Sequence, residues 1–233
     1  MNPSERIAGV AGIPVPPGTA TSAATATDRK TRADADTMPT VIVLASGRGE
    51  RFRASGGALH KLDAPLGGRP VRERTLAAVR ASGLPWHVED IGHPGMGDSI
   101  AAAVRATAGA AGWLVLPADL PLVRPETLRR VALILREASS MPQVPVPAGH
   151  AVQPLHSGRR GHPVAFSAAC RDDLLRLSGE FGAAPVLQRL RAAGCVVELD
   201  VDDIGIVTDI DTLADLAAAE ALLVSRPAGS AQA

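Results

Sequence analysis

Small and basic residues directly follow the first apolar segment of the chain, and their types suit the binding of a triphosphate. Residues 44–52 read LASGRGERF, and Lys61 follows ten positions after Arg51. Small residues let backbone N–H groups approach phosphate oxygens, while a guanidinium and an ammonium neutralise phosphate charge. The segment lacks the Gly-Lys-Ser/Thr of a Walker A loop, and its glycines are not spaced as in the dinucleotide fingerprint. Phosphate binding and a plain connecting turn are therefore the two interpretations of this loop.

Under the phosphate-binding interpretation, the cationic side chains of this loop have two tasks. Arg51 and Lys61 would hold the triphosphate, and they would stabilise the charge that develops on the α-phosphoryl group and on departing pyrophosphate. They are therefore candidate catalytic residues as well as nucleotide-binding ones. The residues expected to bind the triphosphate are Leu44, Ala45, Ser46, Gly47, Gly49, Arg51 and Lys61.

An aspartate stands between two prolines at the end of another apolar run. Residues 114–121 read LVLPADLP, so Asp119 terminates a segment with the character of a buried strand. A carboxylate at a strand end can hold Mg²⁺ through one oxygen and waters, leaving other positions for phosphate oxygens. A turn or helix-capping aspartate is the structural alternative. In the functional interpretation, Asp119 is a magnesium ligand and the third candidate catalytic residue.

A second acidic segment lies near the carboxyl end, where Asp209 and Asp211 are two positions apart. In an extended stretch, side chains two apart share a face, so either carboxylate could be a further metal ligand. Asp211 or Thr212 could instead cap the helix that begins at Leu213. The sequence leaves open which of the two aspartates would bind the metal.

The elements that position these residues alternate in type. Apolar runs predict strands at 40–44, 86–89, 113–116, 164–166 and 196–201. Helical spacing predicts helices at 71–82, 99–108, 126–138, 172–177, 185–193 and 213–224. Residues 139–161 contain four prolines and are expected to be irregular or a β-excursion. This alternation predicts a Rossmann-like three-layer α/β domain whose mainly parallel sheet binds ligands at the carboxyl ends of its strands.

The pattern divides the chain into three parts. Residues 1–39 show no sustained apolar period, which predicts a disordered N-terminal extension. Residues 40–224 form the expected α/β domain, and residues 225–233 are expected to be a flexible tail.

The three acidic and glycine-rich segments, in this order, resemble the nucleotidyltransferase family that includes the molybdenum cofactor guanylyl- and cytidylyltransferases. The resemblance runs from about Thr40 to Leu223. It implies a fold of the nucleotide-diphospho-sugar transferase type, triphosphate binding by the loop that ends at Lys61, and magnesium binding by Asp119.

The resemblance also extends to segments that residue chemistry leaves undefined. Residues 95–100, GMGDSI, look like the family's segment beside the nucleotide base, which implies that Gly97 and Ser99 bind the nucleotide. A plain helix start capped by Asp98 or Ser99 is the alternative. The tripeptide Gly161, His162 and Pro163 is similar to the family's element on the acceptor side, although His162 could be a structural loop histidine. Residues 178–183 resemble the loop before the next helix.

Residues 44–47 and 117–119 look closer to the cytidylyltransferase branch, which favours CTP. Between residues 82 and 95 the chain is shorter than the family pattern, so the base and the acceptor stay open. The expected reaction is Mg²⁺-dependent transfer of CMP to a phosphorylated acceptor such as molybdopterin, with delivery to a molybdoenzyme. The alternatives are guanylyl transfer, another phosphorylated acceptor such as a sugar or lactate-type phosphate, and a non-catalytic cofactor-binding protein.

Composition excludes several partners. The 24 basic and 24 acidic residues balance, so no overall charge draws the chain to nucleic acid or to an anionic membrane, and 2% aromatic residues cannot build stacking platforms. No apolar run reaches the roughly 18 residues of a membrane span, and no basic segment followed by an apolar core opens the chain, so a cytoplasmic protein is expected. Cys170 and Cys195 lack metal-ligand spacing and are expected to be structural.

Overall fold

The computed structural model describes residues 38–140 and 149–225. The expected N-terminal extension lies outside the described residues except for Met38 and Pro39, and the expected tail lies outside them except for Ser225. Met38 packs against the core, and its sulfur accepts a hydrogen bond from Arg136. Within the described ranges, no helix is long and apolar enough to cross a membrane.

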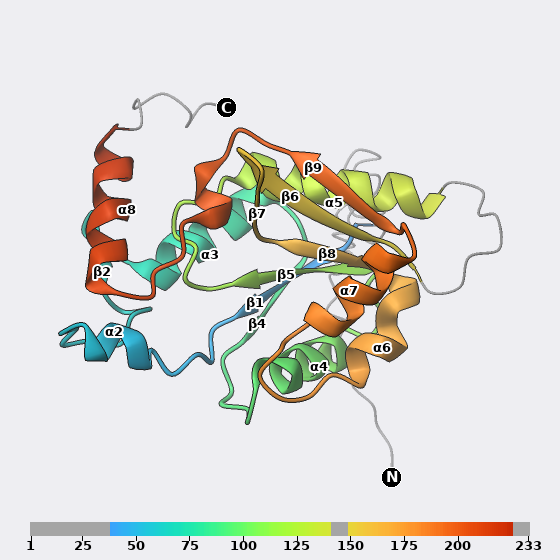
Figure 1. The fold of residues 1–233 in the computed structure, drawn as a ribbon, viewed down its shortest axis with the longest axis horizontal. Coiled ribbons are helices and arrows are strands. Elements are labelled where there is room, and N and C mark those ends of the chain that lie inside the picture. The colour runs from blue at the N-terminus through green and yellow to red at the C-terminus, as the bar shows by residue number, and fades with distance from the viewer. Residues whose placement is uncertain (1–37, 141–148, 226–233) are drawn as a thin grey trace, which may run out of the picture.

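One sheet of seven strands forms the middle layer (Figure 1), in the order β4-β1-β5-β8-β6-β7, and β9 pairs with β6. Its strands are β1 (Thr40–Leu44), β4 (Trp86–Glu89), β5 (Gly112–Pro117), β6 (Ala151–His156), β7 (Arg159–Arg160), β8 (Val164–Ser167) and β9 (Val196–Asp200). The parallel pairs are β1 with β4, β1 with β5, and β6 with β9, whereas β8 runs antiparallel to both of its neighbours. The prediction of a mainly parallel sheet at the core of the domain is confirmed.

Helices cover both faces of this sheet, as Figure 1 shows. One face carries α3 (Val71–Ser82) and α5 (Pro125–Ser140), and the other carries α4 (Met96–Ala106), α6 (Arg171–Leu175) and α7 (Ala184–Ala192). Burial on both faces of the sheet explains why the residues of strand β1 are all apolar or β-branched. Val41 and Val43 pack towards α3 and α5, whereas Ile42 packs towards α4, so successive residues enter two different hydrophobic cores.

The predicted helices are all present, with ends that differ by up to three residues. In α3, Val71, Thr75 and Val79 are buried at helical spacing, and Gly83, with φ 70°, ends the helix in the left-handed conformation. Helix α8 spans Leu213–Ser225. The sequence did not predict the short helix α2 (Glu50–Ala54) or the hairpin of β2 (Pro65–Leu66) and β3 (Arg69–Pro70).

The irregular alternative for residues 139–161 is wrong where the structure describes them, because β6 and β7 lie there and form the β-excursion. Strand β8 pairs with β6 only at Ala151 and Val152, so Pro154, which has no N–H, removes no bond to β8. The prolines of residues 141–148 lie outside the described residues.

Parallel pairing brings the loops after β1 and β5 to one edge of the sheet. The 3-10 helix η2 (Ile204–Val207) and the turn before α8 join them there, because the N–H of Ile210 donates to the carbonyl oxygen of Asp119 at 3.0 Å. Segments about 90 residues apart in sequence therefore meet at the edge where ligands bind in such sheets.

Gly205 sets how closely η2 approaches the loop after β5. A Cβ atom on Gly205 would lie 2.0 Å from the carbonyl oxygen of Leu122. We expect Gly205→Ala to lower the free energy of unfolding by about 2 to 3 kcal/mol, because backbone on both sides must shift. Urea denaturation measures this loss. Gly109→Ala, with open space around the Cβ, is the control, and equal midpoints for both variants would contradict the prediction.

Candidate active site

A cleft of about 790 Å³ opens at the carboxyl ends of β1 and β5. Most residues singled out from the sequence line it. Those that do are Leu44, Ser46, Gly47, Gly49, Arg51, Lys61, Ser99, Asp119, Gly161, His162, Asp209 and Asp211. Ala45, Gly97 and Pro163 do not line the cleft. The backbone N–H of Ala45 instead donates to the carbonyl of Glu89 on β4, which continues the pairing of β1.

Lys61 lies between two carboxylates at the floor of this cleft. Its Nζ atom is 2.6 Å from Oδ2 of Asp119 and 2.6 Å from Oδ1 of Asp211. The Lys61 side chain is 12% exposed, so the ammonium is largely removed from solvent. Arg51, which is 80% exposed, donates to the other oxygen of Asp211 at 2.7 Å. Charges therefore alternate in sign from Arg51 through Asp211 and Lys61 to Asp119.

This alternation stabilises the charged forms of its members. Burial by itself would lower the pKa of Lys61, but the charges and hydrogen bonds of Asp119 and Asp211 more than offset it, so the pKa is raised. Burial would likewise raise the pKa of Asp211, yet Lys61 and Arg51 bring it below its ordinary value. An ammonium and a carboxylate thus face each other at neutral pH.

The oxygen atoms of this cluster fit a divalent cation. Oδ1 of Asp119 is buried without a hydrogen-bond partner, although an ionised carboxylate oxygen in such a place needs a donor or a cation. Asp119 and Asp211 already converge on one positive charge, and carboxylate oxygens are ligands that Mg²⁺ prefers. Asp209 is exposed and lines the same cleft. The described residues contain no group of three or more His, Cys, Asp or Glu side chains close enough to form a complete metal site.

Helix capping does not occupy the carboxylate of Asp211. Asp215 accepts hydrogen bonds from the N–H groups of Asp211 and Thr212, and the Thr212 hydroxyl accepts one from the N–H of Asp215. This reciprocal arrangement is a capping box at the start of α8. Thr212 and Asp215 therefore start the helix, and the side chain of Asp211 is left to the cleft.

The segment that begins α4 contacts the loop after β1 through Ser99. The hydroxyl groups of Ser46 and Ser99 are 3.0 Å apart, which ties the loop after β1 to the first turns of α4. Gly97 has a different role, since a Cβ there would lie 2.8 Å from the backbone of Ser178. Neither Asp98 nor Ser99 is the N-cap residue of α4, because that position is Gly95, to whose carbonyl oxygen the Ser99 hydroxyl donates at 3.3 Å. Asp98 instead accepts from the N–H of Gly179.

On the opposite wall, η2 supports Gly161 and His162. A Cβ on Gly161 would lie 2.5 Å from the carbonyl oxygen of Ile206, and that oxygen accepts the N–H of His162 at 2.9 Å. Nδ1 of His162 is buried without a hydrogen-bond partner. Burial lowers the pKa of His162 from 6.5, while the Val115 carbonyl and the Asp119 and Asp209 charges offset this only in part. The imidazole is neutral at neutral pH.

The lowered pKa of His162 makes stability depend on pH. Below 6.5 the unfolded chain binds a proton at this position that the folded chain binds less readily, so the free energy of unfolding falls as the pH drops below 6.5. We expect His162→Gln to lose less stability than the wild type between about pH 7 and pH 5.5. Parallel pH dependences in chemical denaturation would contradict this expectation.

Several cleft residues were missed by sequence reasoning. Arg159 and Arg160, on the β6–β7 hairpin, line the same wall of the cleft as Gly161. His93 lines the other wall and bonds Glu89, which is buried at the end of β4. No spacing rule joins these residues to the loop after β1. Their only sequence signal is their closeness to strand ends, since Arg159 and Arg160 form the short strand β7 and His93 lies four residues after β4.

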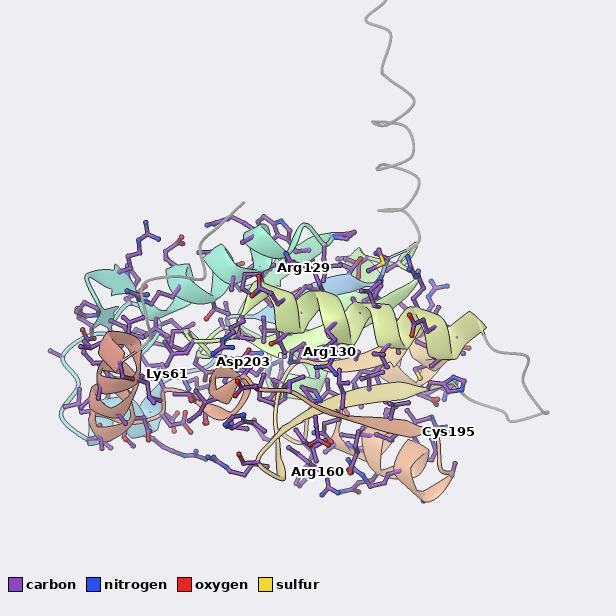
Figure 2. All side chains as sticks on the ribbon, turned by 90° about the horizontal axis from the view of Figure 1, so that it is seen from above. Lys61, Arg129, Arg130, Arg160, Cys195 and Asp203 are labelled. Atoms are coloured by element: carbon purple, nitrogen blue, oxygen red, sulfur yellow. The ribbon has the colours of Figure 1, made fainter. Side chains whose placement is uncertain are left out.

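The cysteines lie away from this chemistry, as expected from their spacing. Cys170 is buried among the residues of the α4 face, and neither cysteine forms a disulfide within the described residues. Figure 2 shows Lys61 near one end of the molecule, beside α8, and Cys195 near the opposite end. Neither cysteine lines the cleft.

The three-layer fold, the glycine-rich loop after β1 and the carboxylates at the strand ends define the class of Rossmann-like nucleotidyltransferases. Residues 41–194 match the family model of the MobA-like NTP transferase domain. The chain belongs to this family, as the resemblance in its motifs indicated.

The 2-C-methyl-D-erythritol 4-phosphate cytidylyltransferase of Cereibacter sphaeroides is 36% identical over 132 residues, which are 45% of this chain. The match covers 57% of that enzyme, so the chain spans little more than half the length of this curated relative.

Three solved structures share the fold, each at an identity below 25%. A nucleotidyl transferase from Methanothermobacter has a TM-score of 0.62 at 23% identity, over 81% of this chain and 99% of that one. Rv0371c from Mycobacterium tuberculosis, in complex with manganese, has a TM-score of 0.57 at 23% identity, over 82% and 100%. Molybdopterin-guanine dinucleotide biosynthesis protein A from Archaeoglobus fulgidus has 0.53 at 20% identity, over 80% and 100%.

Proposed function

We propose that this chain transfers a nucleoside monophosphate from a nucleoside triphosphate to a phosphorylated acceptor and releases pyrophosphate. The observation that carries the proposal is the position of Lys61, held between Asp119 and Asp211 beside the glycine-rich loop. Opposite charges packed in this way leave cationic and anionic groups together in one cleft. A triphosphate brings several negative charges and a divalent cation, which match these two sets of groups.

In the proposed reaction, an oxygen of the acceptor phosphate attacks the α-phosphorus in line with the leaving group. The new P–O bond forms as the bond from the α-phosphorus to the bridging oxygen breaks, and pyrophosphate departs with that electron pair. An acceptor phosphate is already ionised at neutral pH, so no strong general base is needed. The neutral His162 on the acceptor wall is consistent with a binding role rather than with proton removal.

The chain's own residues perform the positioning. The backbone of Ser46, Gly47 and Gly49 would contact the triphosphate, and Arg51 and Lys61 would neutralise charge on the α-phosphoryl group and on pyrophosphate. Asp119 and Asp211 would hold a magnesium ion, with Asp209 as the alternative to Asp211. The metal supplies charge neutralisation and orientation of phosphate oxygens when it is bound. Gly161 and His162 would bind the acceptor.

CTP is the proposed nucleotide, and molybdopterin is the proposed acceptor. The sequence identity of 36% with a cytidylyltransferase supports CTP. Membership of the MobA-like family, and structural similarity to a molybdopterin-guanine dinucleotide biosynthesis protein, support molybdopterin. The manganese complex of a similar fold supports a divalent cation. Guanylyl transfer and a different phosphorylated acceptor are the alternatives that leave the site unchanged.

A pyrophosphate-release screen tests this function. The four nucleoside triphosphates are combined with magnesium or manganese and with molybdopterin, a sugar phosphate or a lactate-type phosphate. Release that requires both CTP and one acceptor is the expected result. Pyrophosphate release with GTP and not with CTP would show that the nucleotide is GTP. Nucleotide binding without release under any combination would favour the non-catalytic cofactor-binding protein over the enzyme.

A further inference from the structure

His60 binds the backbone of the triphosphate loop from outside the cleft. Its Nε2 is 2.8 Å from the carbonyl oxygen of Gly47, and its Nδ1 is 3.3 Å from the backbone nitrogen of Leu62. A carbonyl oxygen only accepts and a backbone N–H only donates, so Nε2 carries the hydrogen and Nδ1 is unprotonated. One neutral tautomer of His60 satisfies both bonds. The ring is half-buried and does not line the cleft.

The next carbonyl of the loop is bound in the same way. Nη2 of Arg53, on α2, donates to the carbonyl oxygen of Arg48 at 2.7 Å. Two consecutive carbonyl groups, those of Gly47 and Arg48, are therefore held by side chains. Because the peptide unit is planar and trans, the N–H that follows each carbonyl points the opposite way. Holding the two carbonyls thus fixes the directions of the N–H groups of Arg48 and Gly49, and these two residues line the cleft.

The conformation of Gly49 depends on the same contact. Gly49 has φ 63°, which glycine adopts without strain, and a Cβ atom there would lie 3.2 Å from Nε2 of His60. The imidazole therefore occupies the space beside Gly49 that a side chain would take. His60, which immediately precedes Lys61 in the chain, therefore lies directly against the loop.

We propose that His60 is a positioning residue that orients the backbone N–H groups of residues 48 and 49 towards the triphosphate. The inference rests on the proposed function, because it presumes a triphosphate at this loop. His60 contacts no ligand itself and acts through the carbonyl of Gly47. Its neighbour Lys61 supplies charge, whereas His60 supplies backbone direction, so both requirements of the loop are met from one short segment.

Two conservative variants separate a positioning role from a general structural one. In His60→Gln, the side-chain amide NH₂ reaches the position of Nε2 and can still donate to Gly47. In His60→Asn, the amide ends near the position of Nδ1 and cannot reach that carbonyl. We expect His60→Asn to weaken the binding of magnesium–CTP about five- to tenfold, the loss of one neutral hydrogen bond, and His60→Gln to stay within about twofold of the wild type. Isothermal titration calorimetry measures both affinities.

His156→Gln is the matched control, because Nδ1 of His156 also bonds a backbone carbonyl, that of Val201, away from the cleft. This variant should bind magnesium–CTP as the wild type does. Equal affinities of the wild type and His60→Asn, or equal losses in His60→Asn and His60→Gln, would overturn the inference alone. A wild-type chain that binds neither CTP nor GTP with magnesium would overturn the proposed function, and the inference with it.

Discussion

Replacing Asp119 with asparagine should lower turnover at least about a hundredfold while the fold stays intact, as expected for the loss of a metal-organising carboxylate. The side chain keeps its size, and the backbone contact between Asp119 and Ile210 is unaffected. What disappears is a charge that lies 2.6 Å from Lys61 and whose second oxygen is buried without a partner. A neutral amide cannot replace it, because its NH₂ group repels cations.

Asp90→Asn is the matched control for this prediction. Asp90 also follows a strand of the same sheet, β4, but it is exposed and lies outside the cleft. Steady-state pyrophosphate release with saturating magnesium compares the two variants, and thermal melting checks that both are folded. Near-normal turnover of Asp119→Asn under these conditions would remove Asp119 from the metal site.

The sheet could be predicted from sequence where both of its faces are covered. The continuous apolar run of β1 indicates a strand that is buried on both faces, and Val41 and Ile42 do enter different hydrophobic cores. The antiparallel direction of β8 could not be predicted, because a run of apolar residues carries no information on direction. Strand β6 was ambiguous because its neighbouring prolines suggest a loop, and pairing with β9, over 40 residues further along, determines its structure.

The site was predictable in residue type and only partly in arrangement. Gly47 and Asp119 follow strands β1 and β5, and strand ends of one sheet meet at one edge, so the proximity of these two residues follows from the fold, whereas Lys61 lies after α2. The bond between Lys61 and Asp211 joins residues 150 positions apart, and no local pattern could indicate it. The sequence also left open whether Asp211 caps α8, and the structure shows that Asp215 accepts the hydrogen bond from the N–H of Thr212 at the start of that helix.

Lys61 was expected from sequence to face phosphate alone, and the structure shows an ammonium that is already paired. Its Nζ atom neutralises Asp119 and Asp211, so removing it should affect the empty protein as well as the bound one. In Lys61→Ala, Asp119 and Asp211 face each other without the ammonium between them, and only Asp211 keeps an ion pair, that with Arg51. We expect a loss of about 1 to 2 kcal/mol in the free energy of unfolding in metal-free buffer, moderated by water that enters the cleft.

The nucleotide and the metal should then respond to Lys61→Ala in opposite directions. Triphosphate affinity should fall about tenfold or more, because a cation that neutralises the phosphate charges is missing. Added magnesium or manganese, however, should raise the melting temperature of Lys61→Ala more than that of the wild type, since a divalent cation no longer competes with the ammonium for Asp119 and Asp211. Lys61→Arg should restore triphosphate binding only in part, because a planar guanidinium is larger than the compact ammonium that fits between the two carboxylates.

Arg72→Ala is the control for these opposite responses, because Arg72 also pairs with a carboxylate, that of Asp63, but both side chains are about half exposed and lie outside the cleft. It should alter neither nucleotide affinity nor the response to metal. Calorimetric titration of nucleotide and thermal melting with and without metal give the two readouts independently. Lys61 would be one more surface cation if Lys61→Ala bound nucleotide like the wild type and gained nothing from metal. If Lys61→Ala lost nucleotide affinity but metal raised its melting temperature no more than that of the wild type, Lys61 would still be assigned to the phosphates. The proposal that a divalent cation replaces the ammonium between the two carboxylates would then be wrong.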